Sequence, residues 1–81
     1  LNGYIFLAPG GKTVQRDENP RVYADPATLP TGPAVKKGTK ITQEQIQQYV
    51  VGSDGKQWVV LVGVPGVKDF SRFPAAALVA A

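Results

Sequence analysis

The stretch "YVVGSDGKQWVVLV" (Tyr49–Val62) decides the fold that the sequence predicts. Two apolar runs flank a polar segment in which Asp54 and Gly55 form a dipeptide typical of β-hairpin turns. We therefore expect a tight hairpin at Ser53–Lys56, with Asp54 and Gly55 as the central pair and a positive φ at Gly55. The second run, "WVVLV" (Trp58–Val62), is apolar without alternation, which indicates a strand buried on both faces.

The rest of the chain consists of short apolar segments that glycines and prolines separate. We expect strands at Tyr4–Ala8 and Arg21–Ala24, and a single turn followed by a strand within Ser71–Ala81. The stretch "DPATLPTGP" (Asp25–Pro33) cannot be helix or central strand because proline lacks a backbone N–H. It is expected to be an ordered loop with Leu29 as its buried anchor. About five short antiparallel strands of this kind are typical of a small β-barrel or sandwich.

A polar, glutamine-rich segment interrupts the strand pattern between Thr42 and Gln48. Thr42 precedes Gln45 by three residues, which is the spacing of a capping box. Ile46 and Val50 follow at helical spacing. We expect one or two helical turns there, with Ile46 facing inward and the glutamines facing water.

Length and composition limit the function classes. The 81 residues are expected to form a single domain (1–81), in which residues 1–20 add an extension of one strand and a loop. Such a chain buries only about 60–65% of its unfolded surface, so assembly into an oligomer or a larger structure would add stability. The sequence has no cysteine and no histidine, which are common metal ligands, and histidine is the commonest general base. We expect no metal site, no cofactor and no catalysis by the chain alone.

The charge of the chain is mildly basic, with nine Lys or Arg, six Asp or Glu and a formal net charge of +3. This is short of a nucleic-acid-binding signature, so we do not expect a nucleic-acid partner. The segment "LNGYIFLAP" (Leu1–Pro9) is too short to span a bilayer and lacks the basic start of a signal peptide. Lys36, Lys37 and Lys40 form a basic cluster, for which a phosphate contact and a solvated turn are the alternatives. We expect a secreted, cell-surface or virion location rather than a cytoplasmic one.

Three segments together resemble one family. "RVYADPATL" (Arg21–Leu29) with "AVKKGTKI" (Ala34–Ile41) resembles the opening of bacterial SH3-like modules of the SH3b type. "GSDGKQWVVLV" (Gly52–Val62) resembles their central hairpin, and "VKDFSRFPAAALV" (Val67–Val79) resembles their last section. The resemblance implies an all-β, SH3-like barrel with a short helical insertion. It also implies a non-catalytic binding or assembly module of bacterial or phage origin, whose ligand is an extended peptide, a cell-wall glycan or a neighbouring subunit.

Two further resemblances imply other functions. "VKDFSRFPAAAL" (Val67–Leu78) is similar to the C-terminal segment of the plasmid-borne type II dihydrofolate reductases, which are small SH3-like barrels that work as tetramers. The alternative function is therefore an oligomeric, NADPH-dependent reductase of that kind. Ser71, Arg72 and Phe73 stand where that family has its Gln-Ile-Tyr signature, so no catalytic residue carries over. "AVKKGTKITQEQI" (Ala34–Ile46) is similar to a phrase of the β-clip SAF domains, which bind sugars or act in flagellar and pilus assembly.

Aromatic residues are the best candidates for a binding site, because SH3-like barrels bind extended ligands on aromatic surface between loops. Tyr23 lies at the entry of the proline-rich loop, and Trp58 begins a strand that we expect to adjoin it. We expect a patch of Tyr23, Trp58 and Tyr49, rimmed by Lys36 and Lys37, whose charge favours an acidic or polar partner. The alternative is that the three rings fill a small core.

Overall fold

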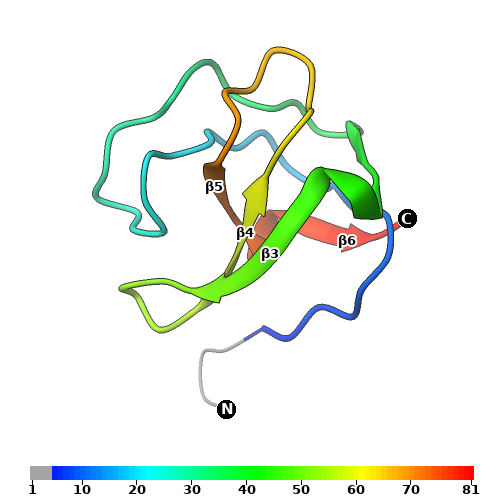
Figure 1. Cartoon of the computed structure of the whole chain (residues 1–81), viewed down its shortest axis with the longest axis horizontal. Helices are drawn as coiled ribbons and strands as arrows, with labels where there is room; N and C mark the ends of the chain where they lie inside the picture. The colour runs from blue at the N-terminus through cyan, green and yellow to red at the C-terminus, as the bar shows by residue number, and fades with distance from the viewer. Residues whose placement is uncertain (1–4) are drawn as a thin grey trace.

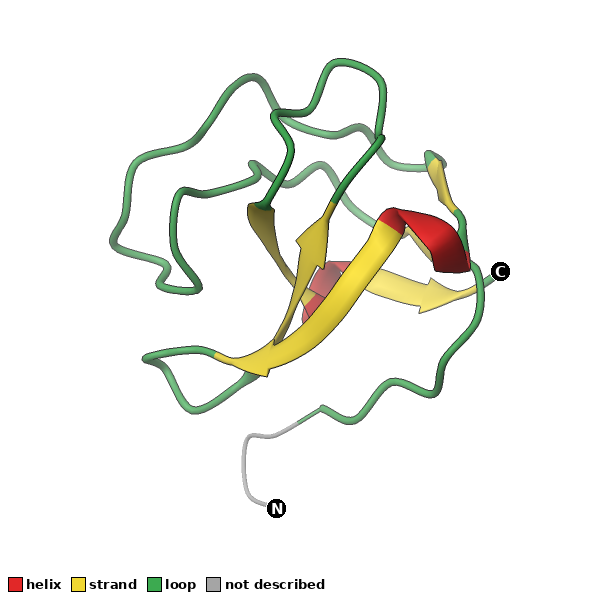
Figure 2. Ribbon diagram, viewed as in Figure 1, coloured by secondary structure: helices red, strands yellow, loops and turns green. Residues whose placement is uncertain are grey.

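The computed structural model describes residues 5–81 and shows an all-β chain with almost no helix (Figure 1; Figure 2). The elements are β1 (Lys12–Val14), β2 (Lys40–Ile41), η1 (Gln43–Gln45), β3 (Ile46–Val51), β4 (Gln57–Leu61), β5 (Ser71–Pro74), η2 (Ala75–Ala77) and β6 (Leu78–Ala80), where η denotes a 3-10 helix. The strands form two three-stranded antiparallel sheets, ordered β2-β1-β6 and β3-β4-β5, and neither sheet closes on itself. The all-β prediction is confirmed.

One apolar core lies between the two sheets. Its buried members come from all six strands and the adjoining loops: Val14, Val35, Ile41, Ile46, Val59, Leu61, Val64, Phe73, Ala77 and Leu78. β4 is the middle strand of its sheet and is buried along its whole length. Val59 and Leu61 belong to this core, while Trp58 and Val60 alternate with them and are each 1% exposed. The prediction of a strand buried on both faces is confirmed.

The connection between β1 and β2, residues 15–39, folds back on itself and borders the β3-β4-β5 sheet (Figure 1). Isolated pairings join Glu18 to Val35 and Arg21 to Pro30. Arg21 also exchanges two backbone hydrogen bonds with Arg72 of β5, each of 2.8 Å. The connection therefore extends the sheet at one residue and then leaves it.

Two predictions within this connection are wrong. The strand expected at Arg21–Ala24 is reduced to the pairing of Arg21, because the chain bends at residues 22–24. Leu29 is 78% exposed rather than buried, because it lies opposite Val22 on the outer side of the connection. The fully buried residue of this region is Pro20.

The strand expected at Tyr4–Ala8 is wrong over residues 5–8, and Tyr4 lies outside the described residues. Two buried polar side chains bind this segment in place of a neighbouring strand. The Gln57 side-chain oxygen accepts the Leu7 N–H at 2.7 Å, and the Lys12 ammonium donates to the carbonyl of Ala8 at 2.6 Å. These side-chain contacts satisfy the backbone without a ladder, while Phe6 is left 76% exposed.

The glutamine-rich segment combines one helical turn with the start of a strand. Thr42 N–H donates to the Gln45 side-chain oxygen at 2.9 Å, so the reciprocal bond of the predicted capping box is present. The helix ends after Gln45, and the expected second turn is instead the first part of β3. A register irregularity between Ile46 and Gln48 marks a β-bulge, which explains why Gln47 and Gln48 are both exposed although they are neighbours in a strand.

The predicted hairpin is present between β3 and β4, with a positive φ of 76° at Gly55. Its loop is longer than expected, because the closing hydrogen bond runs from Gly52 N–H to Lys56 O, at 2.8 Å. Within it, Gly55 N–H donates to Gly52 O at 3.0 Å, so Ser53 and Asp54 form the central pair instead of Asp54 and Gly55. The turn and final strand expected at the C-terminal end are confirmed as η2 and β6.

Candidate functional site

A hollow of about 300 Å³ lies between the β1–β2 connection, the β3–β4 hairpin and η2. We call it the loop–hairpin hollow. Its lining residues are Arg16, Glu18, Arg21, Pro26, Asp54, Lys56, Trp58, Pro74 and Ala76. Two prolines and an indole therefore share one concave surface with charged groups of both signs.

Trp58 is held in the hollow by the hairpin that precedes it. Its indole N–H donates to Asp54 Oδ1 at 3.0 Å, and the same oxygen accepts the Lys56 backbone N–H at 3.0 Å. Asp54 thus shapes the hairpin and satisfies the indole N–H, as a buried tryptophan requires. Trp58 is 1% exposed, so it lines the hollow with very little surface.

Gly52 allows the tip of the β1–β2 connection to contact the hairpin. Ser53 N–H donates to Ala24 O at 2.9 Å across this contact. A Cβ built on Gly52 would lie within 3.0 Å of both the Trp58 indole and the Ala24 carbonyl oxygen. Glycine is needed at this position because no side chain fits between the Trp58 indole and Ala24 at the tip of the connection.

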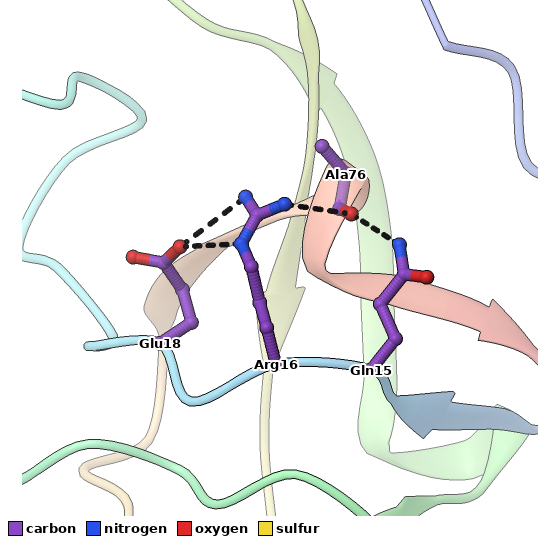
Figure 3. Close-up of polar contacts among 4 residues, drawn as sticks. All are labelled: Gln15, Arg16, Glu18 and Ala76. Atoms are coloured by element: carbon purple, nitrogen blue, oxygen red, sulfur yellow. Dashed lines mark hydrogen bonds and ion pairs between the residues drawn. The ribbon is translucent and has the colours of Figure 1, made fainter.

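Arg16 fixes the other end of the hollow to η2 (Figure 3). Its guanidinium lies 3.3 Å from the Glu18 carboxylate and donates to the Ala76 carbonyl at 3.3 Å. The Gln15 side-chain amide donates to the same carbonyl at 2.6 Å. The ion pair is partly exposed, so we expect it to contribute less than about 1 kcal/mol to stability. The ion pair fixes Arg16 and Glu18 relative to each other at this end of the hollow.

The electrostatics of the hollow favour a ligand with negative charge. Arg16, Arg21 and Lys56 are opposed by Glu18 and Asp54, so three cations against two carboxylates leave one excess positive charge. Arg16 is paired, and the Arg21 guanidinium donates to Thr28 O at 2.8 Å. The Lys56 ammonium has no hydrogen-bond or ion-pair partner within residues 5–81, so it is the cation available to a ligand.

The structure separates the three aromatic residues that the sequence analysis grouped. Tyr23 is 64% exposed, as expected for a ring beside the proline-rich loop. Tyr49 is half-buried and packs against the core, and Trp58 is buried. The alternative that a ring fills the interior therefore holds for Trp58, whereas Tyr23 offers its surface at the loop tip, between Arg21 and Pro26 along the chain.

Lys36 and Lys37 lie away from Tyr23. The pairings of Glu18 with Val35 and of Arg21 with Pro30 place the two lysines at the base of the β1–β2 connection and Tyr23 near its tip. Both lysines contact Asp17, which accepts the Lys37 backbone N–H at 2.8 Å and lies 3.6 Å from the Lys36 ammonium.

These contacts lower the pKa of Asp17 below its ordinary value of 3.8, mainly through the Lys37 N–H bond and then through the Lys36 charge. The geometry matches the solvated-turn interpretation of the lysine cluster. The structure does not bring Lys36 and Lys37 to the predicted aromatic patch.

Four residues of the loop–hairpin hollow were not predicted from the sequence: Arg16, Arg21, Lys56 and Pro74. They come from three segments that are far apart in the chain, and no local spacing connects them. The signal in the sequence that could have pointed to this site was Asp54, four residues before Trp58. A carboxylate at this spacing can reach the indole N–H from the hairpin loop. Residues 67–78, which the sequence analysis compared with the reductases, cover the end of the β4–β5 connection, β5, η2 and the first residue of β6, and Phe73 among them is 0% exposed.

Comparisons with protein-family models, curated proteins and solved structures found no match to this chain. Over residues 5–81, no three His, Cys, Asp or Glu side chains gather in a way that could hold a metal ion. The same part of the chain has no helix of the length and hydrophobicity needed to cross a membrane. The site is therefore interpreted from its own geometry.

Proposed function

We propose that the chain is a non-catalytic binding module that holds an extended peptide in the loop–hairpin hollow. The observation that carries the proposal is the unengaged Lys56 ammonium beside an apolar wall of Pro26, Trp58 and Pro74. An extended peptide directs successive side chains to opposite sides. It can place an apolar side chain against the prolines and a carboxylate near Lys56.

The arrangement of the elements supports an SH3-like barrel as the fold of this module. A long connection follows β1, a hairpin joins β3 to β4, and η2 lies between β5 and β6. The two sheets share one core. In this fold the ligand lies between loops, as it would between the β1–β2 connection and the hairpin.

A peptide suits this hollow better than the other ligands that the sequence left open. A glycan ring binds well against an open aromatic face, but the aromatic ring that lines this hollow, Trp58, is buried, and Tyr23 is not one of its lining residues. A neighbouring subunit of a bacterial or phage assembly would bind in the same way if it presents an extended segment. The proposal therefore includes assembly through such a segment.

The proposal is tested by selecting peptides from a displayed library against the purified chain and measuring the dissociation constant of the best one. Lys56→Glu reverses the available charge and is expected to weaken binding about tenfold. Lys37→Glu is the matched control, since Lys37 is also exposed but lies at the base of the connection, and it should change affinity less than about twofold.

Two results would overturn the proposal. The first is a library that yields no specific peptide, and the second is a larger effect of Lys37→Glu than of Lys56→Glu. The reductase alternative rests on its sequence resemblance and is tested separately by size-exclusion chromatography with an NADPH titration. A tetramer that binds NADPH and reduces dihydrofolate would replace the binding module as the function.

A further inference from the structure

Phe70 adopts a backbone conformation that is costly for its residue type. Its φ is 68°, the one positive φ outside glycine within residues 5–81. Elsewhere in the β4–β5 connection this region is occupied by glycine, at Gly63 with φ 68° and Gly66 with φ 76°. A bulky side chain in left-handed backbone is strained, and such strain is concentrated at functional sites.

The fold requires the backbone of Phe70 but not its ring. The Phe70 N–H donates to Leu61 O at 2.7 Å, which closes the β4–β5 connection. A glycine would make the same bond without strain. The ring is 53% exposed and is absent from the apolar core. Phe70 therefore combines a strained backbone with surface that is available to a partner.

An exposed apolar side chain, Val22, shares a hollow with this ring. Val22 and Phe70 line a hollow of about 170 Å³ together with Thr31, Lys68, Asp69, Ser71 and Arg72. Val22 N–H donates to Leu29 O at 3.3 Å, next to the paired residues Arg21 and Pro30. Residues directly opposite in an antiparallel pair project from the same face, so Leu29 lies beside Val22. We call Val22, Leu29 and Phe70 the Phe70 surface.

The charged groups beside the Phe70 surface carry one excess positive charge: Lys68 and Arg72 are cations and Asp69 is a carboxylate. Arg72 Nη1 donates to the Phe70 carbonyl at 2.9 Å and the Val22 carbonyl at 3.4 Å. Arginine has five N–H donors, so the guanidinium keeps donors for a carboxylate while it joins the two sides of the surface. The carboxylate of Asp69 already accepts the Gly63 N–H at 2.9 Å.

We propose that the Phe70 surface is a second binding site, which takes a segment of a partner protein in which a large apolar side chain neighbours a carboxylate. The apolar side chain packs on Phe70, Val22 and Leu29, and the carboxylate binds Arg72 with Lys68 nearby. Charge complementarity selects this occupant, because an apolar surface beside excess positive charge rejects basic segments.

This site is distinct from the loop–hairpin hollow. Arg21 lines one hollow and Val22 lines the other, although they are consecutive residues. The two hollows have no lining residue in common. This proposal therefore does not depend on the proposed function of the loop–hairpin hollow.

The probe is the blocked peptide acetyl-Gly-Glu-Leu-Phe-Glu-Gly-amide, titrated into the nitrogen-15-labelled chain and followed by amide NMR shifts. We expect shifts centred on Val22, Phe70 and Arg72. A peptide with lysine in place of both glutamates should bind about tenfold more weakly, because its charge repels the Arg72 side. Absence of shifts at these amides, or equal binding of the two peptides, would overturn the proposal.

The decisive variant is Phe70→Gly, with Val79→Ser as the control for loss of an exposed apolar side chain elsewhere. Phe70→Gly should weaken the acidic peptide about tenfold while the denaturation midpoint is unchanged or higher, because the ring binds and the strain is relieved. Val79→Ser should leave binding unchanged. Unchanged binding of Phe70→Gly would contradict the site, and so would a clear fall in its denaturation midpoint.

A concentration series of the chain alone tests for a different occupant. We expect a monomer signal at the concentrations of the titration. Self-association that Phe70→Gly abolishes would assign this surface to a second copy of the chain and would overturn the partner-segment proposal.

Discussion

The β3–β4 hairpin and the β4–β5 connection both contain residues in special backbone conformations or tight contacts, but the fit between residue type and conformation differs between them. In the β3–β4 hairpin, Gly52 has no room for a side chain and Gly55 has a positive φ, so the fold favours glycine at both positions. In the β4–β5 connection, Phe70 has a positive φ where glycine would be easier. The first connection shows residues that the fold selects. The second contains a residue in strained backbone, and this strain is the observation from which the Phe70 surface is proposed.

The largest effect is expected for Gly52→Ala. The new Cβ would lie within 3.0 Å of the buried Trp58 indole and of the Ala24 backbone oxygen, neither of which moves easily. We expect a loss of about 3 kcal/mol in the free energy of unfolding, measured by urea denaturation. Gly32→Ala is the control, because a Cβ there meets nothing within 4 Å and should change stability little. Equal effects of the two variants would contradict the close contact at Gly52.

A smaller loss is expected for Gly55→Val. A Cβ at Gly55 would meet nothing within 4 Å, so a side chain has space there. Its cost comes from backbone strain at the φ of 76° alone. We expect about 1–2 kcal/mol, and less for Gly55→Asn, because asparagine tolerates left-handed backbone. Urea denaturation of the two variants under the same conditions measures the difference. A valine variant as stable as the natural chain would remove the turn assignment.

Phe70→Gly should leave the free energy of unfolding unchanged or raise it by less than about 1 kcal/mol. Relief of left-handed strain is offset by the greater entropy of glycine in the unfolded chain and by the contacts that the ring loses. The comparison with Gly55→Val is informative because both positions have left-handed backbone in the same sheet. A loss at Phe70→Gly as large as that at Gly52→Ala would show that the ring belongs to the fold after all.

The smallest effect is expected for Asp17→Asn, and it depends on pH. The pKa of Asp17 is below its ordinary value of 3.8, so the carboxylate stabilises the folded chain above that pH and loses this contribution as the pH falls through the lowered value. The natural chain should therefore exceed the variant slightly in stability at neutral pH, with the difference vanishing in acid. NMR titration of the Asp17 carboxyl gives the pKa directly, and an ordinary or raised value would contradict the Lys37 N–H bond.

The sequence predicted best what local rules determine. The hairpin, the positive φ of Gly55, the buried strand at Trp58 and the cap at Thr42 depend on neighbours within a few residues. Predictions failed where side chains replaced backbone pairing. Lys12 and Gln57 hold the segment that was expected to be a strand, and nothing in the local pattern shows that a distant glutamine accepts the Leu7 N–H.

The candidate site was predicted only in part, for the same reason. Tyr23 was correctly expected to be exposed, because it borders a loop that prolines keep out of the sheet. The rim of Lys36 and Lys37 was chosen by closeness in sequence, but the folding back of the β1–β2 connection places Arg21 near the hairpin and the lysines at the base. The β3–β4 hairpin places Lys56 beside residues that are far from it in the sequence. The spacing of residues along the chain does not reveal such a long-range arrangement.

The central claim is that the loop–hairpin hollow is the principal ligand site. Amide NMR shifts of the nitrogen-15-labelled chain on addition of the library-selected peptide test it most directly. We predict that the largest shifts fall on Arg21, Tyr23 and Lys56, and that Lys56→Glu weakens all three together. Shifts concentrated instead on Lys36 and Lys37, at the base of the connection, would contradict the claim.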